Sequence, residues 1–138
     1  MKDVVTYLSF EDNCREAMTF YAKCLGAELM IMPFSAAPGD VGKDMPDRIM
    51  HARLTKGSTP ILMASDSPPH MPYRPGNNFS VSISCESAEE IDRLFTAFQE
   101  GGKVTMPLGD MFWGARFGMI EDRFGIRWMF NYELPKQG

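Results

Sequence analysis

The sequence has neither a concentration of basic residues nor a long apolar run. No run of Lys or Arg exceeds two residues and the net charge is −4, whereas nucleic-acid binding needs a concentrated basic face. A membrane span needs about 18 consecutive apolar residues, and no such run occurs. The N-terminus also lacks the apolar core of a signal peptide. We therefore expect a cytoplasmic, soluble protein with no nucleic-acid or membrane partner.

Cysteine and histidine are scarce. The three cysteines, Cys14, Cys24 and Cys85, form no CxxC pair, which is typical of reduced thiols. Cys14 lies at the predicted start of a helix, so a nucleophilic role stays an alternative. The only imidazoles are His51 and His70, and the prolines around His70 indicate a solvated loop. Few residues are therefore available for metal or acid–base chemistry.

Apolar periodicity predicts two helices and eight strands. The helices begin near residue 14 and at the capping box Ser87-Ala-Glu-Glu90. Asn13 is the expected cap of the first helix, and Gly26 is its expected left-handed end. An irregular loop is predicted over 35–46 and a hairpin turn over 122–125. The predicted strands cover 4–10, 29–34, 48–55, 60–64, 79–85, 103–108, 112–121 and 126–132.

The two halves of the chain resemble each other. Glu11, Phe20 and Gly26 recur at a constant offset as Glu86, Phe95 and Gly101, and Met32-Pro33 recurs as Met106-Pro107. A proline-rich seam over 66–77 separates the copies. Internal repetition determines architecture more firmly than any single element does. We predict one α+β domain over 1–138, with halves of about 1–67 and 77–138. Two βαβββ modules would pair into an eight-stranded mixed sheet that encloses a cavity.

Several segments, in order and at matching spacing, resemble one protein family. They are Tyr7-Leu8-Ser9-Phe10, Asn13-Cys14-Arg15-Glu16-Ala17, Phe20-Tyr21, Met50-His51-Ala52, Ser65-Asp66, Phe112-Trp113-Gly114 and Asp122-Arg123-Phe124-Gly125. They look like the PhnB-like branch of the vicinal oxygen chelate superfamily, also labelled 3-demethylubiquinone-9 3-methyltransferase-like. The resemblance implies a glyoxalase/bleomycin-resistance/dioxygenase-like fold. Open sheet edges predict a homodimer, and the resemblance implies one as well, because members of this family commonly associate.

The resemblance also implies a divalent metal held by His or Glu from the first and last strands of each half. The matching positions here are Thr6 or Tyr7, Met63, Phe79 or Ser80, and Met129. None is a histidine or a carboxylate, so we predict that this metal site is absent and leave the cofactor unknown. A relocated site would have to combine His51 with Asp66 or Glu28.

His51 is the candidate for acid–base chemistry. Strand alternation places Met50, Ala52 and Leu54 on one side and His51 and Arg53 on the other. If the apolar side faces a helix, His51 and Arg53 face the cavity. His51 is then either a hydrogen-bonded structural residue or a general base with Tyr7 as proton donor, since histidine ordinarily titrates near neutral pH.

Trp113 and Arg116 lie among glycines in a predicted strand. Trp113 is either a core residue or a cavity wall. Arg116 needs an anionic partner, which could be Asp66, Glu121, Asp122 or a ligand. Asp122 itself is expected to hold the hairpin turn.

We expect the cavity to bind a partly apolar small molecule that carries a few polar or anionic groups. Three functions fit this description: a metal-independent enzyme using His51, a non-catalytic sequestering protein as in resistance-type relatives, and a metal-dependent lyase, isomerase or dioxygenase with a relocated site. The expected ligand-binding residues are Ser9, Arg53, Met63, Ser80, Ser82, Trp113, Arg116 and Met129.

Overall fold

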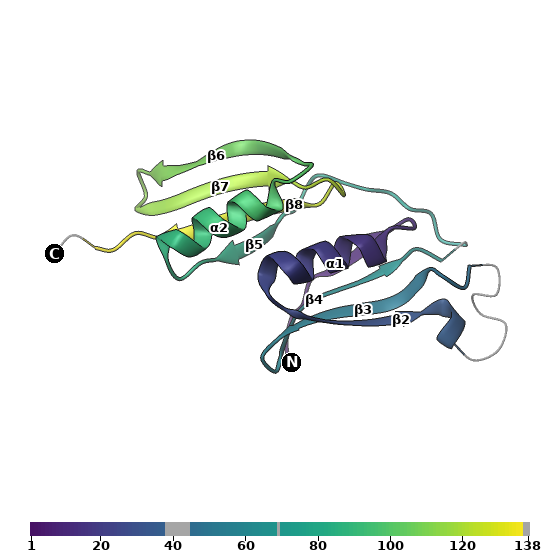
Figure 1. Cartoon of the computed structure of the whole chain (residues 1–138). Coiled ribbons are helices and arrows are strands. Elements are labelled where there is room, and N and C mark those ends of the chain that lie inside the picture. The colour runs from purple at the N-terminus through teal and green to yellow at the C-terminus, as the bar shows by residue number, and fades with distance from the viewer. Residues whose placement is uncertain (38–44, 69, 137–138) are drawn as a thin grey trace. The chain divides into compact units, whose positions relative to one another are not determined.

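The computed structural model describes residues 1–37, 45–68 and 70–136. The chain divides into two compact units, Met1–Arg74 and Pro75–Gly138, which are drawn in purple to teal and in green to yellow in Figure 1. The boundary lies inside the predicted proline-rich seam. Each unit has the order β-α-β-β-β, as the internal repeat indicates. That the two units form one domain with a shared cavity stays a prediction.

The first unit holds a four-stranded mixed sheet with the order β1-β4-β3-β2. β1 runs parallel to β4, and the other neighbours are antiparallel. Part of the predicted loop 35–46 forms a short 3-10 turn, while 38–44 lie outside the described residues. The elements are β1 (Tyr7–Phe10), α1 (Cys14–Leu25), β2 (Glu28–Pro33), η1 (Phe34–Ala36), β3 (Ile49–Lys56) and β4 (Thr59–Asp66).

Helix α1 covers one face of this sheet and contacts β2, β3 and β4. The side chains on that face are buried, and Met18 and Tyr21 of α1 are buried with them. The alternation of buried positions follows the strand period of two. The buried strand residues are Leu8, Phe10, Ile49, Ala52, Leu54, Leu62, Ala64 and Asp66.

The start of α1 differs from the prediction. Asn13 makes no side-chain capping hydrogen bond. Instead, Oδ1 of Asp66 accepts a 2.9 Å hydrogen bond from the backbone N–H of Cys14. The end of the helix is as predicted, because Gly26 adopts the left-handed conformation with φ of 62°. A carboxylate at the end of β4 therefore takes over part of the role expected of Asn13.

The second unit repeats the topology with the order β5-β8-β7-β6. The prediction for one hairpin was wrong in detail: β6 continues to Met111, and β7 begins at Ala115 rather than at residue 112. The elements are β5 (Val81–Ser84), α2 (Ala88–Phe98), β6 (Lys103–Met111), β7 (Ala115–Glu121) and β8 (Arg127–Glu133).

Aromatic packing forms the core of the second unit. Phe98 of α2 lies 4.6 Å from Trp128 of β8, measured between ring centroids, and all of these side chains are buried. Asp122 holds the β7–β8 turn as predicted: Oδ1 accepts from the backbone N–H groups of Phe124 and Ile126, each at 2.9 Å. Its Oδ2 accepts from the Trp128 indole at 2.8 Å. The buried carboxylate thus ties the turn to the core.

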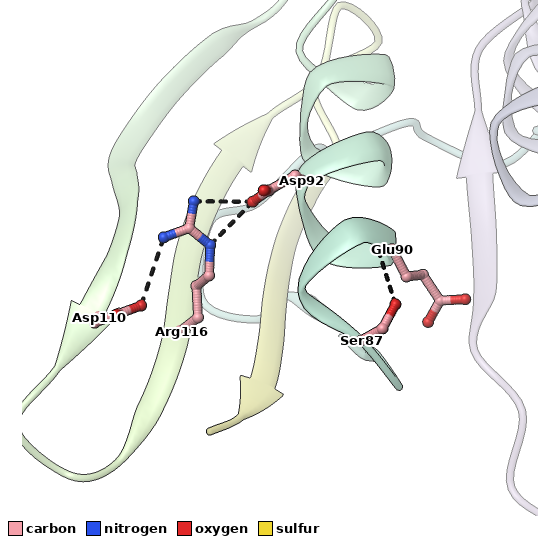
Figure 2. A network of polar contacts seen from close by, with 5 residues as sticks. All are labelled: Ser87, Glu90, Asp92, Asp110 and Arg116. Carbon is pink, nitrogen blue, oxygen red and sulfur yellow. Dashed lines mark hydrogen bonds and ion pairs between the residues drawn. The ribbon is translucent and has the colours of Figure 1, made fainter. Parts of the chain in front are cut away.

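The predicted capping box of α2 is confirmed. The backbone N–H of Glu90 donates to Oγ of Ser87 at 3.0 Å, as Figure 2 shows. The Glu90 carboxylate reaches back to the backbone N–H of Glu86 at 2.9 Å. Two four-stranded mixed sheets with two α-helices confirm the α+β class. None of the described helices is long and apolar enough to span a bilayer.

Candidate functional site

The first sheet has a second face, opposite α1, which we call the open face of the first sheet. One row of paired positions crosses all four strands, because Tyr7 pairs with Met63, Met63 with Arg53, and Arg53 with Met30. These residues alternate with the buried set, so their side chains project away from the helix. Ser9 lies on this face as well, paired with Ser65. The five predicted site residues of this half therefore share one face: Tyr7, Ser9, His51, Arg53 and Met63.

Tyr7 and His51 are in direct contact on the open face of the first sheet. The Tyr7 hydroxyl lies 3.2 Å from Nδ1 of His51, and the ring centroids are 5.8 Å apart. Tyr7 is 48% exposed and His51 is half-buried. The hydrogen bond joins β1 to β3 across β4. It couples the two residues that the sequence singled out for proton transfer.

Two proton arrangements satisfy this hydrogen bond. If the Tyr7 hydroxyl donates to Nδ1, the proton of neutral His51 is on Nε2. If Nδ1–H donates to the Tyr7 oxygen, Nε2 has a free lone pair and the phenol O–H is free to donate elsewhere. The second arrangement places a base and an acid side by side.

Arg53 lies two residues after His51 on β3, on the same face. Its Nε is buried and has no hydrogen-bond partner. Met63 and Met30 flank it on the neighbouring strands. A buried N–H group without an acceptor is uncommon in folded proteins. It is therefore a candidate point of contact for a ligand.

The open face of the second sheet, opposite α2, is lined by methionines. Ser82 pairs with Met129, Met129 with Met119, and Met119 with Met106. Ser80 directly precedes β5 and is half-buried. Thioether side chains are flexible and polarizable, so such a row can adapt to an apolar ligand. Ser82 and Met129, both predicted site residues, lie side by side here.

Of the two roles predicted for Trp113, the core position is wrong, and the side chain instead lines a hollow. It belongs to the turn between β6 and β7 and is 54% exposed. Its ring packs at 5.1 Å against Phe112, which is 98% exposed, and at 5.8 Å against Phe117. A hollow of about 720 Å³ adjoins it, lined also by Asn131, Glu133 and the segment 134–136. The prediction of a strand position was wrong because Gly114, with φ of 89°, turns the chain.

Arg116 lies on the helix side of the second sheet and is not part of its open face. Its Nε donates to Oδ1 of Asp92 on α2 at 2.9 Å, and its Nη1 lies 3.5 Å from Oδ1 of Asp110 on β6; Figure 2 shows both carboxylates around the guanidinium. The hydrogen bond with Asp92 raises the pKa of Arg116 above its ordinary value. The sequence indicated a carboxylate partner but proposed the wrong residues, Asp66, Glu121 and Asp122.

The residues named for a relocated metal site do not come together. Asp66 is buried on the helix side of the first sheet, where it accepts from Cys14 and from the backbone N–H of Ile49 at 2.7 Å. His51 projects from the opposite face. Glu28 is exposed at the start of β2, opposite Thr55. Within 1–37, 45–68 and 70–136, no group of three or more His, Cys, Asp or Glu side chains could hold a metal ion.

The cysteines are poor nucleophiles. Burial raises the pKa of the Cys14 thiol to about 12, and the negative charge of Asp66 raises it further than Arg15 lowers it. Burial and Glu90 raise the pKa of Cys85 to about 11. Thiolate formation requires the opposite environment. The alternative of a nucleophilic Cys14 is therefore not supported.

The open face of the first sheet also holds Met30, Met32 and Ser65, which were not predicted as site residues. Met32 pairs with His51 and is 40% exposed. The alternation of β2 was available as a signal, since Met30 and Met32 occupy every second position. Both faces of β2 carry apolar side chains, so an alternation of polar and apolar residues could not show which face is open.

The sequence and the fold match one large family and several solved proteins. A model of the Glyoxalase/Bleomycin resistance protein/Dioxygenase superfamily matches residues 4–130. Protein YjdN of Escherichia coli is 33% identical over 136 residues, which cover 91% of each chain. The crystal structure of PA1353 from Pseudomonas aeruginosa is 48% identical, with a TM-score of 0.87 over 98% of this chain and 100% of that one.

The predicted resemblance to the PhnB-like branch is confirmed as well. The PhnB protein of Bacillus cereus, whose proposed activity is that of a 3-demethylubiquinone-9 3-methyltransferase, is 28% identical. Its structure superposes with a TM-score of 0.76 over 95% of this chain and 99% of that one.

Proposed function

Since the chain belongs to the Glyoxalase/Bleomycin resistance protein/Dioxygenase superfamily, we propose that it binds a small molecule on the open face of the first sheet and transfers a proton there. The observation that carries this proposal is the 3.2 Å hydrogen bond between the Tyr7 hydroxyl and Nδ1 of His51. Both side chains lie on the face that α1 leaves uncovered. An acid and a base in contact are the minimum that proton transfer needs.

In the proposed mechanism His51 is the base. With Nδ1–H donating to the Tyr7 oxygen, the free Nε2 removes a proton from a carbon next to a carbonyl group. The Tyr7 O–H donates to the carbonyl oxygen as negative charge develops on it, so the product is the enol and the new negative charge resides on the phenolate next to protonated His51. Positioned acid–base groups typically contribute about 10² to 10⁴ in rate.

The proposal includes no metal ion. Tyr7, Met63 and Met129 occupy positions where relatives with a metal would supply ligands, and a phenol and two thioethers are poor ligands for hard divalent cations. In place of a metal ion, the hydroxyl of Tyr7 donates a hydrogen bond and then its proton to the carbonyl oxygen. A metal-dependent activity built on His51 and Asp66 is not supported, because the two side chains project from opposite faces of the sheet.

Hydrogen–deuterium exchange tests the catalytic part. In D₂O, the full chain should accelerate exchange of the carbon-bound protons of hydroxyacetone, followed by NMR, and treatment with a chelator should leave the rate unchanged. His51→Gln should reduce the rate to background, and Tyr7→Phe should reduce it by about 10². Arg93→Gln on the exposed side of α2 is the matched control and should match the wild type.

A non-catalytic binding protein is the second candidate function. The methionine row on the open face of the second sheet favours it, because an adaptable apolar surface can bind ligands without any chemistry. If wild type and His51→Gln exchange hydroxyacetone protons at the same rate, sequestration is the better description. The metal-independent proton transfer would then be wrong.

We also propose that the chain forms a homodimer. The support is the exposed apolar side chains on the two open faces, where Met32 is 40% and Met106 is 37% exposed. The outer edges of β1, β2, β5 and β6, which pair with no other strand among the described residues, add to it. Light scattering should give twice the chain mass of 15.6 kDa. A single chain mass at micromolar concentration would contradict the proposal.

A further inference from the structure

Arg53 supplies the permanent positive charge on the open face of the first sheet among the described residues. Its Nε is buried without a hydrogen-bond partner, and methionines occupy the paired positions on both sides of it. Neither thioether can replace the water that the Nε–H group loses on burial. A buried N–H donor without an acceptor is a group whose partner has still to be identified.

The nearby carboxylates do not neutralise this charge. Asp66 is on the other face, where both of its oxygens accept backbone hydrogen bonds. Glu28 begins β2 opposite Thr55 and is exposed, and no ion pair joins it to Arg53 among the described residues. The remaining titratable neighbours on this face, His51 and Tyr7, are bonded to each other. The Arg53 guanidinium is therefore free to bind an incoming anion.

We infer that Arg53 binds a carboxylate of the ligand, so that the ligand class is a small organic acid with an apolar portion; this inference rests on the proposed binding function of the same face. The planar guanidinium presents Nε–H and one Nη–H in parallel, which matches the two oxygens of a carboxylate. A single arginine balances one negative charge. The more highly charged phosphate groups are usually bound by several cations or by a helix N-terminus, and the N-terminus of α1 is on the opposite face.

The placement of the neighbours defines the rest of the ligand. Met30 and Met63 flank Arg53 and contact the carbon chain next to the carboxylate. His51 is two residues along β3, so its Cα is roughly 7 Å from that of Arg53. This spacing corresponds to a few carbon–carbon bonds between the carboxylate and the position at which His51 acts. Arg53 is thus a binding residue that determines which end of the ligand lies near Tyr7 and His51.

Matched probes with and without the charge test the inference. The full chain, labelled with ¹⁵N, is titrated with hexanoate and separately with hexanamide, while the Arg53 Nε–H signal is followed by NMR. Hexanoate should shift that signal and bind about ten- to a hundredfold more tightly than hexanamide. Arg53→Gln should abolish the preference for hexanoate. Arg53→Lys should weaken hexanoate several-fold, because an ammonium group lacks the planar pair of donors.

The control is Arg93→Gln, which removes the same charge from an exposed position on α2 and should bind hexanoate as the wild type does. Equal affinity for hexanoate and hexanamide would overturn the inference, as would unchanged hexanoate binding in Arg53→Gln. If Arg53→Gln does not fold, Arg53→Lys decides, and wild-type hexanoate affinity there would overturn it. If the wild type does not bind hexanoate and the dimer dissociates in Arg53→Gln, Arg53 is a subunit-contact residue instead.

The carboxylate site and the proposed catalysis can fail separately. Loss of hydroxyacetone exchange alone refutes the proposed catalysis and leaves the carboxylate site intact.

Discussion

Asp66 at the end of β4 accepts a 2.9 Å hydrogen bond from the backbone N–H of Cys14, the first residue of α1. Its second oxygen accepts from the backbone of Ile49 at 2.7 Å, and the side chain is 2% exposed. One carboxylate thus joins the beginning of the helix to two strands of the same unit. Asp66 therefore supplies the acceptor at the start of α1 that the sequence predicted from Asn13.

Asp66→Asn should destabilise the first unit by about 1–3 kcal/mol, because an amide NH₂ would then face a backbone N–H that needs an acceptor. Urea unfolding followed by circular dichroism measures this change. Asp92→Asn is the matched control, since its side chain is 55% exposed and exposed ion pairs contribute only about 0–1 kcal/mol. Equal effects of the two substitutions would contradict the structural role of Asp66.

Gly102→Ala should be poorly tolerated. An added Cβ would lie 2.5 Å from the backbone oxygen of Glu121 and 2.9 Å from Cα of Asp122. These are backbone atoms at the end of β7 and in the turn that follows it, and they cannot move aside as a flexible side chain can. We expect a cost of about 1–3 kcal/mol, as for other overpacked sites.

Gly109→Ala is the matched control, on β6, the strand that begins directly after Gly102. A Cβ there meets no atom within 4 Å, so the thermal midpoint should stay close to that of the wild type. If Gly109→Ala lowers the midpoint as much as Gly102→Ala does, close packing is not the reason that glycine occurs at residue 102.

Cys14 should react very slowly with thiol reagents in the folded protein. Burial raises its pKa to about 12, so at pH 8 only roughly one thiol in ten thousand is a thiolate. Labelling with iodoacetamide, read by mass spectrometry, should modify Cys14 only when urea is added. Rapid modification of the native chain at Cys14 would contradict the buried environment.

The same shift predicts a loss of stability at alkaline pH. The Cys14 thiol keeps its proton in the folded state up to a pKa of about 12, whereas the unfolded chain releases it near the ordinary cysteine pKa of 9.0. The stabilisation is therefore fully present below pH 9 and is lost as the pH rises toward 12. The free energy of unfolding should fall less steeply over this range in Cys14→Ala than in the wild type.

Arg116→Gln should leave hexanoate binding unchanged, because Arg116 is on the helix side of the second sheet and is bonded to Asp92 and Asp110. Its removal should cost at most about 1 kcal/mol, since all three side chains are partly exposed. Calorimetry for binding and urea unfolding for stability check the two parts. Weakened hexanoate binding would restore Arg116 to the ligand site.

The sequence was sufficient to predict that the site residues of the first unit share one face of the sheet. Alternation along β3 was sufficient to separate His51 and Arg53 from Ala52 and Leu54, because one face packs on a helix and the other does not. The turn that contains Trp113 could not be predicted in the same way. Aromatic residues have a high strand propensity, so the pattern favoured a strand there, although Gly114 is a residue type that often marks a turn.

Sequence patterns alone were sufficient for the repeat, the order of elements in each half, and the faces of the β3 residues, because these follow from periods of two and 3.6 residues along the chain. Which side chains contact each other depends on the three-dimensional arrangement of the strands. Asp66 bonds to Cys14 across 52 residues, and Tyr7 bonds to His51 across 44. Such contacts depend on the pairing of β1 with β4 and of β4 with β3, and that register is set by packing between segments far apart in the sequence.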